Sequence, residues 1–139
     1  MFRDDYLMRL IRQLVDFLAR IAGHNRRGEH DKALSEAARA WDDLLDVPRE
    51  LVDITDTPTL AGMLREPEKM RAAAQLLIEE GRAFAGKRDP ATATMRYRKA
   101  LELYLEARVL APDPADDAIL FELSREAATH LDPRYVDRD

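Results

Sequence analysis

The chain has 139 residues and a formal net charge of −5, and it contains no cysteine. Its charged fraction of 35% and hydrophobic fraction of 46% are typical of a folded globular protein rather than a disordered one. The acidic balance argues against nucleic-acid binding, and the lack of cysteine excludes disulfides, thiolate metal sites and a cysteine nucleophile.

The N-terminal stretch MFRDDYLMRL does not have the pattern of a signal peptide. Asp4 and Asp5 stand where such a peptide carries basic residues. Nowhere does an uncharged run approach the ~20 apolar residues of a membrane span. Together with the absence of cysteine, which suits a reducing compartment, this predicts a cytoplasmic protein that binds no membrane.

Apolar residues recur at helical spacing along most of the chain. They predict long helices over 3–22, 31–46, 67–85, 90–111 and 114–131, with two short helices or turns in the less regular stretch 48–65. No run of alternating β-branched residues indicates a sheet. Four pairs typical of helix starts support these boundaries: Thr57-Pro58, Asp89-Pro90, Asp113-Pro114 and Asp132-Pro133.

These elements predict an all-α fold in a single domain, 1–139. Two elongated antiparallel helical hairpins, 3–46 and 67–111, are joined by a connector of short helices at 47–66. A capping helix at 114–131 closes the array. Each hairpin has a polar turn with glycine, followed by a second helix with alanines at helical spacing, which allow close helix packing.

The later hairpin resembles the tetratricopeptide repeat, a helical hairpin of 34 residues. The second helix of that repeat typically reads A-x-x-x-[FY]-x-x-A with a proline five residues later, and Ala100, Tyr104, Ala107 and Pro112 match it. Gly28, Ala33, Leu34 and Ala40 match part of a first copy, where Ala37 replaces the usual aromatic residue. The stretch from Gly81 to Ala100 is about two turns longer than the repeat, so stretched hairpins are expected.

Two segments also resemble a family of uncharacterised bacterial proteins of similar length, a domain of unknown function. They are F-x-x-D-Y-x-M-R-x-I-x-Q-L, from Phe2 to Leu14, and Y-x-K-A-L-E-L-Y-L-E-A, from Tyr97 to Ala107. The resemblance supports the helical fold. It implies no catalytic residues, because none are established for that family.

The stretch GRAFAGKR, residues 81–88, comes within one residue of the phosphate-binding motif G-x-x-x-x-G-K-[ST]. That motif needs a buried strand before it and a hydroxyl for Mg²⁺, but a helical pattern precedes Gly81 and Arg88 replaces the hydroxyl residue. We therefore interpret Gly81 as a close-packing residue within a helix. Gly86 is expected to be a left-handed C-terminal cap, with Lys87 and Arg88 facing the negative end of the helix dipole.

Histidines and carboxylates give no catalytic or metal prediction. His24 and His30 flank the first turn at a spacing that matches no zinc motif, so solvated turn residues are the favoured interpretation, with a metal site using Glu29 and Asp31 as the alternative. The many aspartates are explained as helix caps and solvated faces. No ionisable cluster is apparent at the positions that should face the core. We expect no catalytic residue, no cofactor and no metal.

Two surfaces are candidates for partner binding. Arg96 and Lys99, beside Tyr97, could hold an anionic group of a partner, although pairing with nearby glutamates explains them more simply. The first helix is the second candidate, because its apolar side chains span roughly 200°, while one contact face needs only about 100°. Met8, Val15 and Phe17 lie on the surplus.

These observations favour a non-enzymatic protein–protein interaction module of tetratricopeptide-like type. Its candidate contacts are Met8, Val15, Phe17, Arg96, Tyr97 and Lys99, and its partner is an unidentified protein or peptide. A homodimer through the first helix would cover the surplus apolar side. The alternatives are a small-ligand-binding or enzymatic protein with a pocket between the hairpins, and a homo-oligomeric building block.

Overall fold

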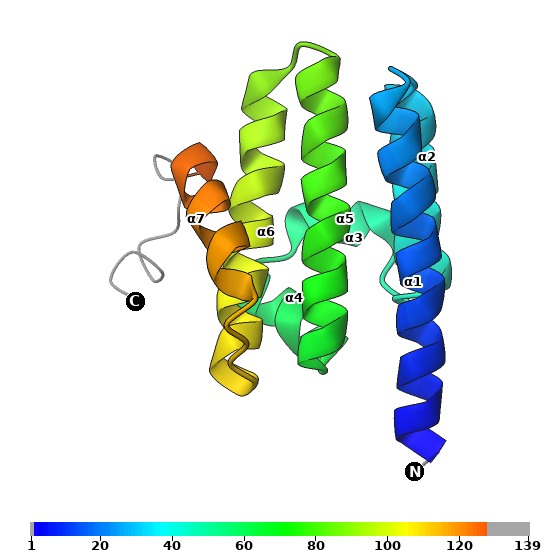
Figure 1. Ribbon diagram of the computed structural model, residues 1–139, viewed down its shortest axis with the longest axis vertical. Coiled ribbons are helices and arrows are strands. Elements are labelled where there is room, and N and C mark those ends of the chain that lie inside the picture. Colours follow the sequence, from blue (N-terminus) through cyan, green and yellow to red (C-terminus); the bar gives the residue numbers. More distant parts are fainter. Residues whose placement is uncertain (1, 128–139) are drawn as a thin grey trace.

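The computed structural model describes residues 2–127, and within them it contains seven helices and no strand (Figure 1). The all-α prediction is confirmed. The helices are α1 (Phe2–Arg26), α2 (His30–Asp43), α3 (Arg49–Ile54), α4 (Thr57–Leu64), α5 (Pro67–Gly86), α6 (Pro90–Leu110) and α7 (Asp116–Ala127). The pairs α1–α2 and α5–α6 are antiparallel hairpins, as predicted, and α3 and α4 form the connector (Figure 1).

Helix α5 is the centre of the fold. It contacts α6 on one side and both α1 and α2 on the other, while α7 packs against α6 (Figure 1). Every long helix therefore turns an apolar face towards one continuous core. The largest buried side chains of this core include Leu14, Ile21, Trp41, Leu60, Leu77 and Leu103. Packing consistent with hairpins is observed, and the tetratricopeptide arrangement of the hairpins remains a prediction.

Two of the four predicted helix starts need correction. Asp89 caps α6 as expected, because its carboxylate accepts hydrogen bonds from the Thr92 backbone N and hydroxyl. For α4, however, the cap is Asp56, which accepts from the Thr59 backbone N at 2.8 Å, and Thr57 is the first helical residue. Helix α7 begins at Asp116 rather than Pro114. The pair at 132–133 lies outside the described residues.

The stretch 81–88 ends one helix and turns to the next. Gly81 lies inside α5, where a Cβ would collide with the ring of Tyr97, so its close-packing role is confirmed. The prediction of a left-handed Gly86 is wrong, since the residue with positive φ is Arg88, at 65°. Gly86 is the last residue of α5, and a Cβ there would strike the ring of His30. The α5–α6 turn therefore needs this glycine because the first hairpin comes so close.

Candidate functional site

The predicted contact residues fall into two groups that the fold separates. Met8, Val15 and Phe17 lie on α1, whereas Arg96, Tyr97 and Lys99 lie on α6. Helix α5 stands between these two helices (Figure 1). The six residues therefore cannot form one binding surface, and each group is considered by itself.

Helix α1 carries a row of exposed residues on the side away from the core. This row, here called the outer seam, consists of Asp5, Met8, Arg12, Val15 and Ala19, all of which are exposed. Their spacing alternates between three and four residues, which is the spacing that keeps side chains on one line of a helix that packs against another helix. Met8 and Val15 are 57% and 56% exposed.

The inner side of α1 is buried by contrast. Leu10, Leu14 and Ile21 are at most 5% exposed and face α2 and α5. Phe17 belongs to this half-buried side and not to the outer seam, because guanidinium groups from α1 and α2 cover its ring: Arg20 lies 4.4 Å and Arg39 lies 5.8 Å from the ring centroid. The prediction of Phe17 as part of the exposed surplus is therefore wrong.

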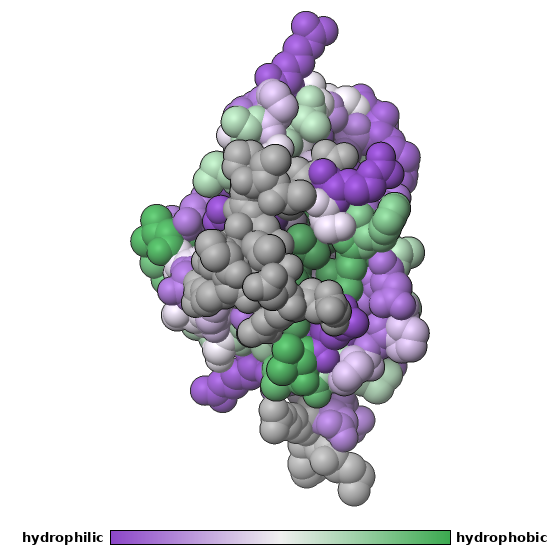
Figure 2. Space-filling model, turned by 90° about the vertical axis from the view of Figure 1, so that its left-hand side faces the viewer, coloured by the Kyte–Doolittle hydropathy of each residue, from purple (hydrophilic) through white to green (hydrophobic). Residues whose placement is uncertain are grey.

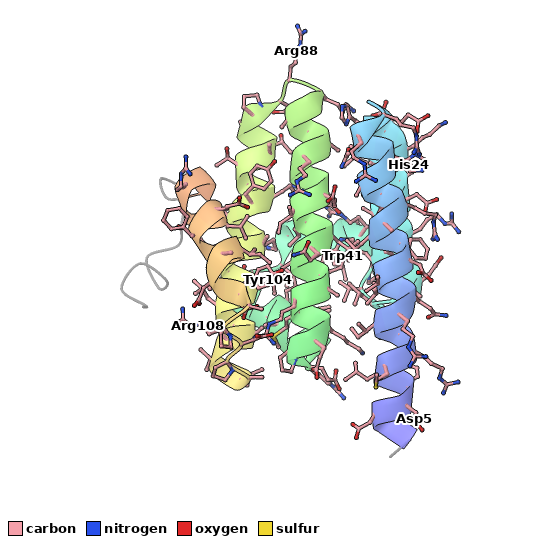
Figure 3. The ribbon with its side chains drawn as sticks, viewed as in Figure 1. Asp5, His24, Trp41, Arg88, Tyr104 and Arg108 are labelled. Carbon is pink, nitrogen blue, oxygen red and sulfur yellow. The ribbon has the colours of Figure 1, made fainter. Side chains whose placement is uncertain are left out.

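The N-terminal turns of α1 extend past the end of α2, which has 14 residues against the 25 of α1. Figure 1 shows this projecting end, and Figure 3 shows Asp5 close to it. Asp5 and Arg12 make no ion pair with another described residue of the chain. The outer seam thus combines two exposed apolar side chains with one acid and one base on the side of α1 that faces away from the core.

A buried charge cluster joins the two hairpins. The Glu80 carboxylate, of which 1% is exposed, accepts hydrogen bonds from Trp41 Nε1 at 3.2 Å, from Arg49 Nη2 at 2.6 Å and from Arg96 Nε at 3.0 Å. Asp53 lies near the surface and accepts from the same two guanidinium groups, at 3.1 Å and 3.2 Å. The four groups come from α3, α5 and α6, and Trp41 comes from α2.

This cluster overturns the expectation that no ionisable cluster faces the core. Glu80 follows Ala73 and Leu77 at the spacing of one helix face, a signal in the sequence that would have placed it inward. Its two acids and two arginines balance in charge, and arginine does not give up its proton near neutral pH. Since the carboxylate of Glu80 is fully engaged, the arrangement suits a structural junction rather than acid–base chemistry.

The residues of α6 predicted to hold an anionic group of a partner do not form an exposed basic surface. Arg96 is 15% exposed and is held by Glu80 and Asp53. Lys99 Nζ donates to the Thr55 carbonyl oxygen at 2.5 Å, and burial lowers the pKa of Lys99. Tyr97 is half-buried, with its ring against Gly81. The simpler alternative, pairing within the chain, is correct for Arg96, although its partners are not the glutamates expected from the sequence.

Other buried polar groups also hold elements together. Arg71 on α5 donates to the buried Asp116 carboxylate of α7 at 2.8 Å and to the Ala111 carbonyl at 2.6 Å. Thr57 on α4 donates to buried Glu102 on α6 at 2.5 Å. These contacts connect neighbouring helices and leave the carboxylates engaged, so they are structural.

The two histidines of the first turn are partly buried and hydrogen-bonded. His24 Nδ1 lies 2.9 Å from Glu29 Oε1, and His30 Nδ1 lies 3.0 Å from Asn25 Oδ1. Their interpretation as solvated residues needs this correction, because both take part in the packing of the turn. Among residues 2–127, no group of three or more histidines, aspartates or glutamates is placed to hold a metal ion.

A cavity of about 690 Å³ opens between α5, α6 and α7. It is therefore on the far side of the second hairpin rather than between the hairpins. Its lining mixes apolar and polar side chains, which include Ile78, Arg82, Ala93, Tyr97, Glu122 and Leu123. Figure 2 looks onto this side of the molecule and shows hydrophilic and hydrophobic residues interspersed on its visible part.

The chain matches no protein-family model, no curated protein and no solved structure. The two resemblances noted in the sequence, to the tetratricopeptide repeat and to the bacterial family of unknown function, therefore stay predictions. None of the helices formed by residues 2–127 combines the length and the apolar character needed to cross a bilayer.

Proposed function

We propose that the protein is a non-enzymatic interaction module that binds a helix of another protein chain along the outer seam of α1. The observation that carries the proposal is the pair Met8 and Val15, which are more than half exposed and lie on one line along the outer side of α1. Exposed apolar residues in one line on a helix are the usual contact for a second helix.

The rest of the structure is compatible with a scaffold role. Buried carboxylates such as Glu80, Glu102 and Asp116 are each engaged by donors from a neighbouring helix. Glu80 also accepts a hydrogen bond from Trp41 of α2, and this contact connects the first hairpin, to which α1 belongs, to the second. A composition without cysteine and the resemblance to a bacterial family support a bacterial cytoplasmic setting for this role.

A photo-reactive amino acid in place of Met8 tests the proposal in living cells. On illumination, we expect a covalent adduct with a second protein chain, and we expect Val15→Glu in the same chain to abolish it. The matched control is the same photo-reactive residue in place of Met95 on α6, which is 56% exposed and lies off the outer seam. If both positions give the same adducts, or if neither gives one, the proposal is wrong.

A second candidate function, binding of a small amphipathic molecule, is favoured by the cavity beside α7. Its volume of about 690 Å³ lies in the range of small-molecule pockets. The fluorescent probe 1-anilinonaphthalene-8-sulfonate tests this candidate. Binding of one probe per chain, lost when Thr94→Trp fills the cavity and kept in Met8→Glu, would support it. Equal binding of the probe by the wild type and by Thr94→Trp would exclude the cavity as the binding site.

A further inference from the structure

We infer that the helix bound by the outer seam is the same helix of a second copy, in antiparallel orientation. This inference rests on the proposed function and names its partner. The seam carries opposite charges at Asp5 and Arg12, seven residues apart, with Met8 between them and Val15 and Ala19 beyond. Such a row can serve as its own complement.

Charge decides the orientation. In a parallel pair, equivalent residues of the two seams face each other, so Asp5 would meet Asp5 and Arg12 would meet Arg12 of the second copy. Like charges facing each other across a helix interface disfavour the pair. In an antiparallel pair centred near Leu10, Arg12 stands level with Met8 of the second copy and one helical turn from its Asp5. The same contact occurs twice, as two-fold symmetry requires.

The apolar residues fit the same alignment. With the two-fold axis near Leu10, Asp5 stands level with Val15 of the second copy, and Met8 stands level with Arg12. The methylene groups of Arg12 can then cover Met8 while its guanidinium reaches Asp5. Residues 2–18 of the two copies overlap, which is about 25 Å of helix at 1.5 Å per residue.

The fold leaves this side of α1 accessible. Its neighbours α2 and α5 lie against the opposite, buried side, and the first turns of α1 project past α2 (Figure 1). All five residues of the outer seam are exposed. A second copy can therefore approach without any rearrangement of the core.

Disulfide trapping tests the orientation cleanly, because the chain contains no cysteine of its own. One sample contains only Asp5→Cys chains, a second only Val15→Cys chains, and a third an equal mixture. The antiparallel arrangement predicts a rapid disulfide in the mixture and little in either single sample. A parallel arrangement predicts disulfides in both single samples. That result, or no disulfide in any sample, would overturn the inference.

A charge swap tests the contact itself, with sedimentation velocity over a concentration series as the readout. We expect Arg12→Glu to raise the dimer dissociation constant about tenfold, since it leaves acid facing acid. Asp5→Arg with Arg12→Glu in one chain should restore the wild-type constant within about threefold. Failure of the double variant to recover, with native circular dichroism, would contradict the contact.

The inference and the proposed function fail in different ways. Wild-type protein that stays monomeric at about 100 µM, while Met8 still crosslinks in cells to a chain of another mass, would remove the second copy as partner and keep the interaction module. Adducts of twice the chain mass support both. Absence of any adduct at Met8 removes both.

Discussion

Gly81 lies where the Tyr97 ring of α6 packs directly against the backbone of α5. A matched pair of substitutions can therefore separate the effect of side-chain packing from that of helix propensity. A Cβ on Gly81 would strike the Tyr97 ring, whereas a Cβ on Gly62, within α4, would meet nothing. We expect Gly81→Ala to destabilise the protein by about 1–3 kcal/mol, because the ring must move. Gly62→Ala should stabilise by about 0.5–1 kcal/mol, because alanine favours the helix. Urea unfolding measures both, and equal effects would contradict this account.

The Glu80 cluster gives the second prediction at the scale of single residues. Glu80→Gln removes the charge that neutralises Arg49 and Arg96, so we expect a loss of about 3 kcal/mol in the free energy of unfolding. Trp41, the single tryptophan, hydrogen-bonds to Glu80, and its fluorescence reports the change directly. Glu50→Gln, at an exposed carboxylate of α3, is the control and should be neutral. If Glu80→Gln leaves the free energy of unfolding unchanged, the cluster does not hold the hairpins together.

The roles of single residues were predicted with uneven success, and the reason is physical. Gly81 was correctly assigned to close packing, because a glycine that weakens the middle of a helix is usually there to let a second helix approach. Gly86 was assigned to the wrong role, because the ring of His30 comes near it from another hairpin. The partners of Arg96 could not be predicted, because Glu80 and Asp53 reach it only after α3, α5 and α6 have packed. Contacts between distant segments leave no local pattern.

At the scale of elements, the attachment of α7 is the contact most open to test. Arg71 on α5 is the donor that engages buried Asp116 at the first turn of α7. We expect Arg71→Met to destabilise the protein by about 3 kcal/mol and to speed amide hydrogen exchange in α7, because the carboxylate stays buried without its partner. Exchange detected by mass spectrometry over residues 116–127 measures this.

The control for α7 is Arg39→Met, which removes an exposed arginine of α2 that pairs with Glu36 on its own helix. It should leave exchange in α7 unchanged. Adding Asp116→Leu to Arg71→Met should recover part of the lost stability, since no charge is then left buried. If the amides of α7 exchange as slowly in Arg71→Met as in the wild type, apolar packing alone attaches this helix.

Helices were the best-predicted level of the structure. Apolar spacing located every long helix, because a helix that packs against one core repeats its pattern over many residues. Boundaries were less accurate where the cap is a residue outside the proline pair, as with Asp56 at α4. The outer seam of α1 was partly predicted: the surplus apolar width was recognised, but Phe17 was assigned to it because the cover provided by Arg39 of α2 has no local signature.

At the scale of the whole molecule, the two hairpins are joined at the end where the α1–α2 turn and the α5–α6 turn lie. We call this end the turn end. Asn25, at the end of α1, donates to the backbone carbonyl and the carboxylate of Glu79 on α5. Lys87, at the end of α5, pairs with Asp31 of α2 at 2.5 Å. The two hairpins are thus tied at the cluster around Glu80 and again at their turns. The polar composition of GHNRRGEHD suggested only a solvated turn, since the residues that it meets lie more than fifty positions away.

This turn end also predicts how stability responds to acid. Hydrogen bonds from His24 and Arg27 lower the pKa of Glu29 from 4.5 to about 2. Because its pKa is lower in the folded chain than in the unfolded chain, the unfolded chain takes up the proton first as the pH falls. The contribution of Glu29 to the free energy of unfolding is therefore fully present above about pH 4.5 and is lost as the pH falls from 4.5 to about 2. Glu29→Gln should make the decline in unfolding free energy shallower in that window. Urea titrations followed by Trp41 fluorescence at a series of pH values measure the slope, with Glu50→Gln as the exposed control. Equal slopes for Glu29→Gln and the control would show that these hydrogen bonds do not persist in solution.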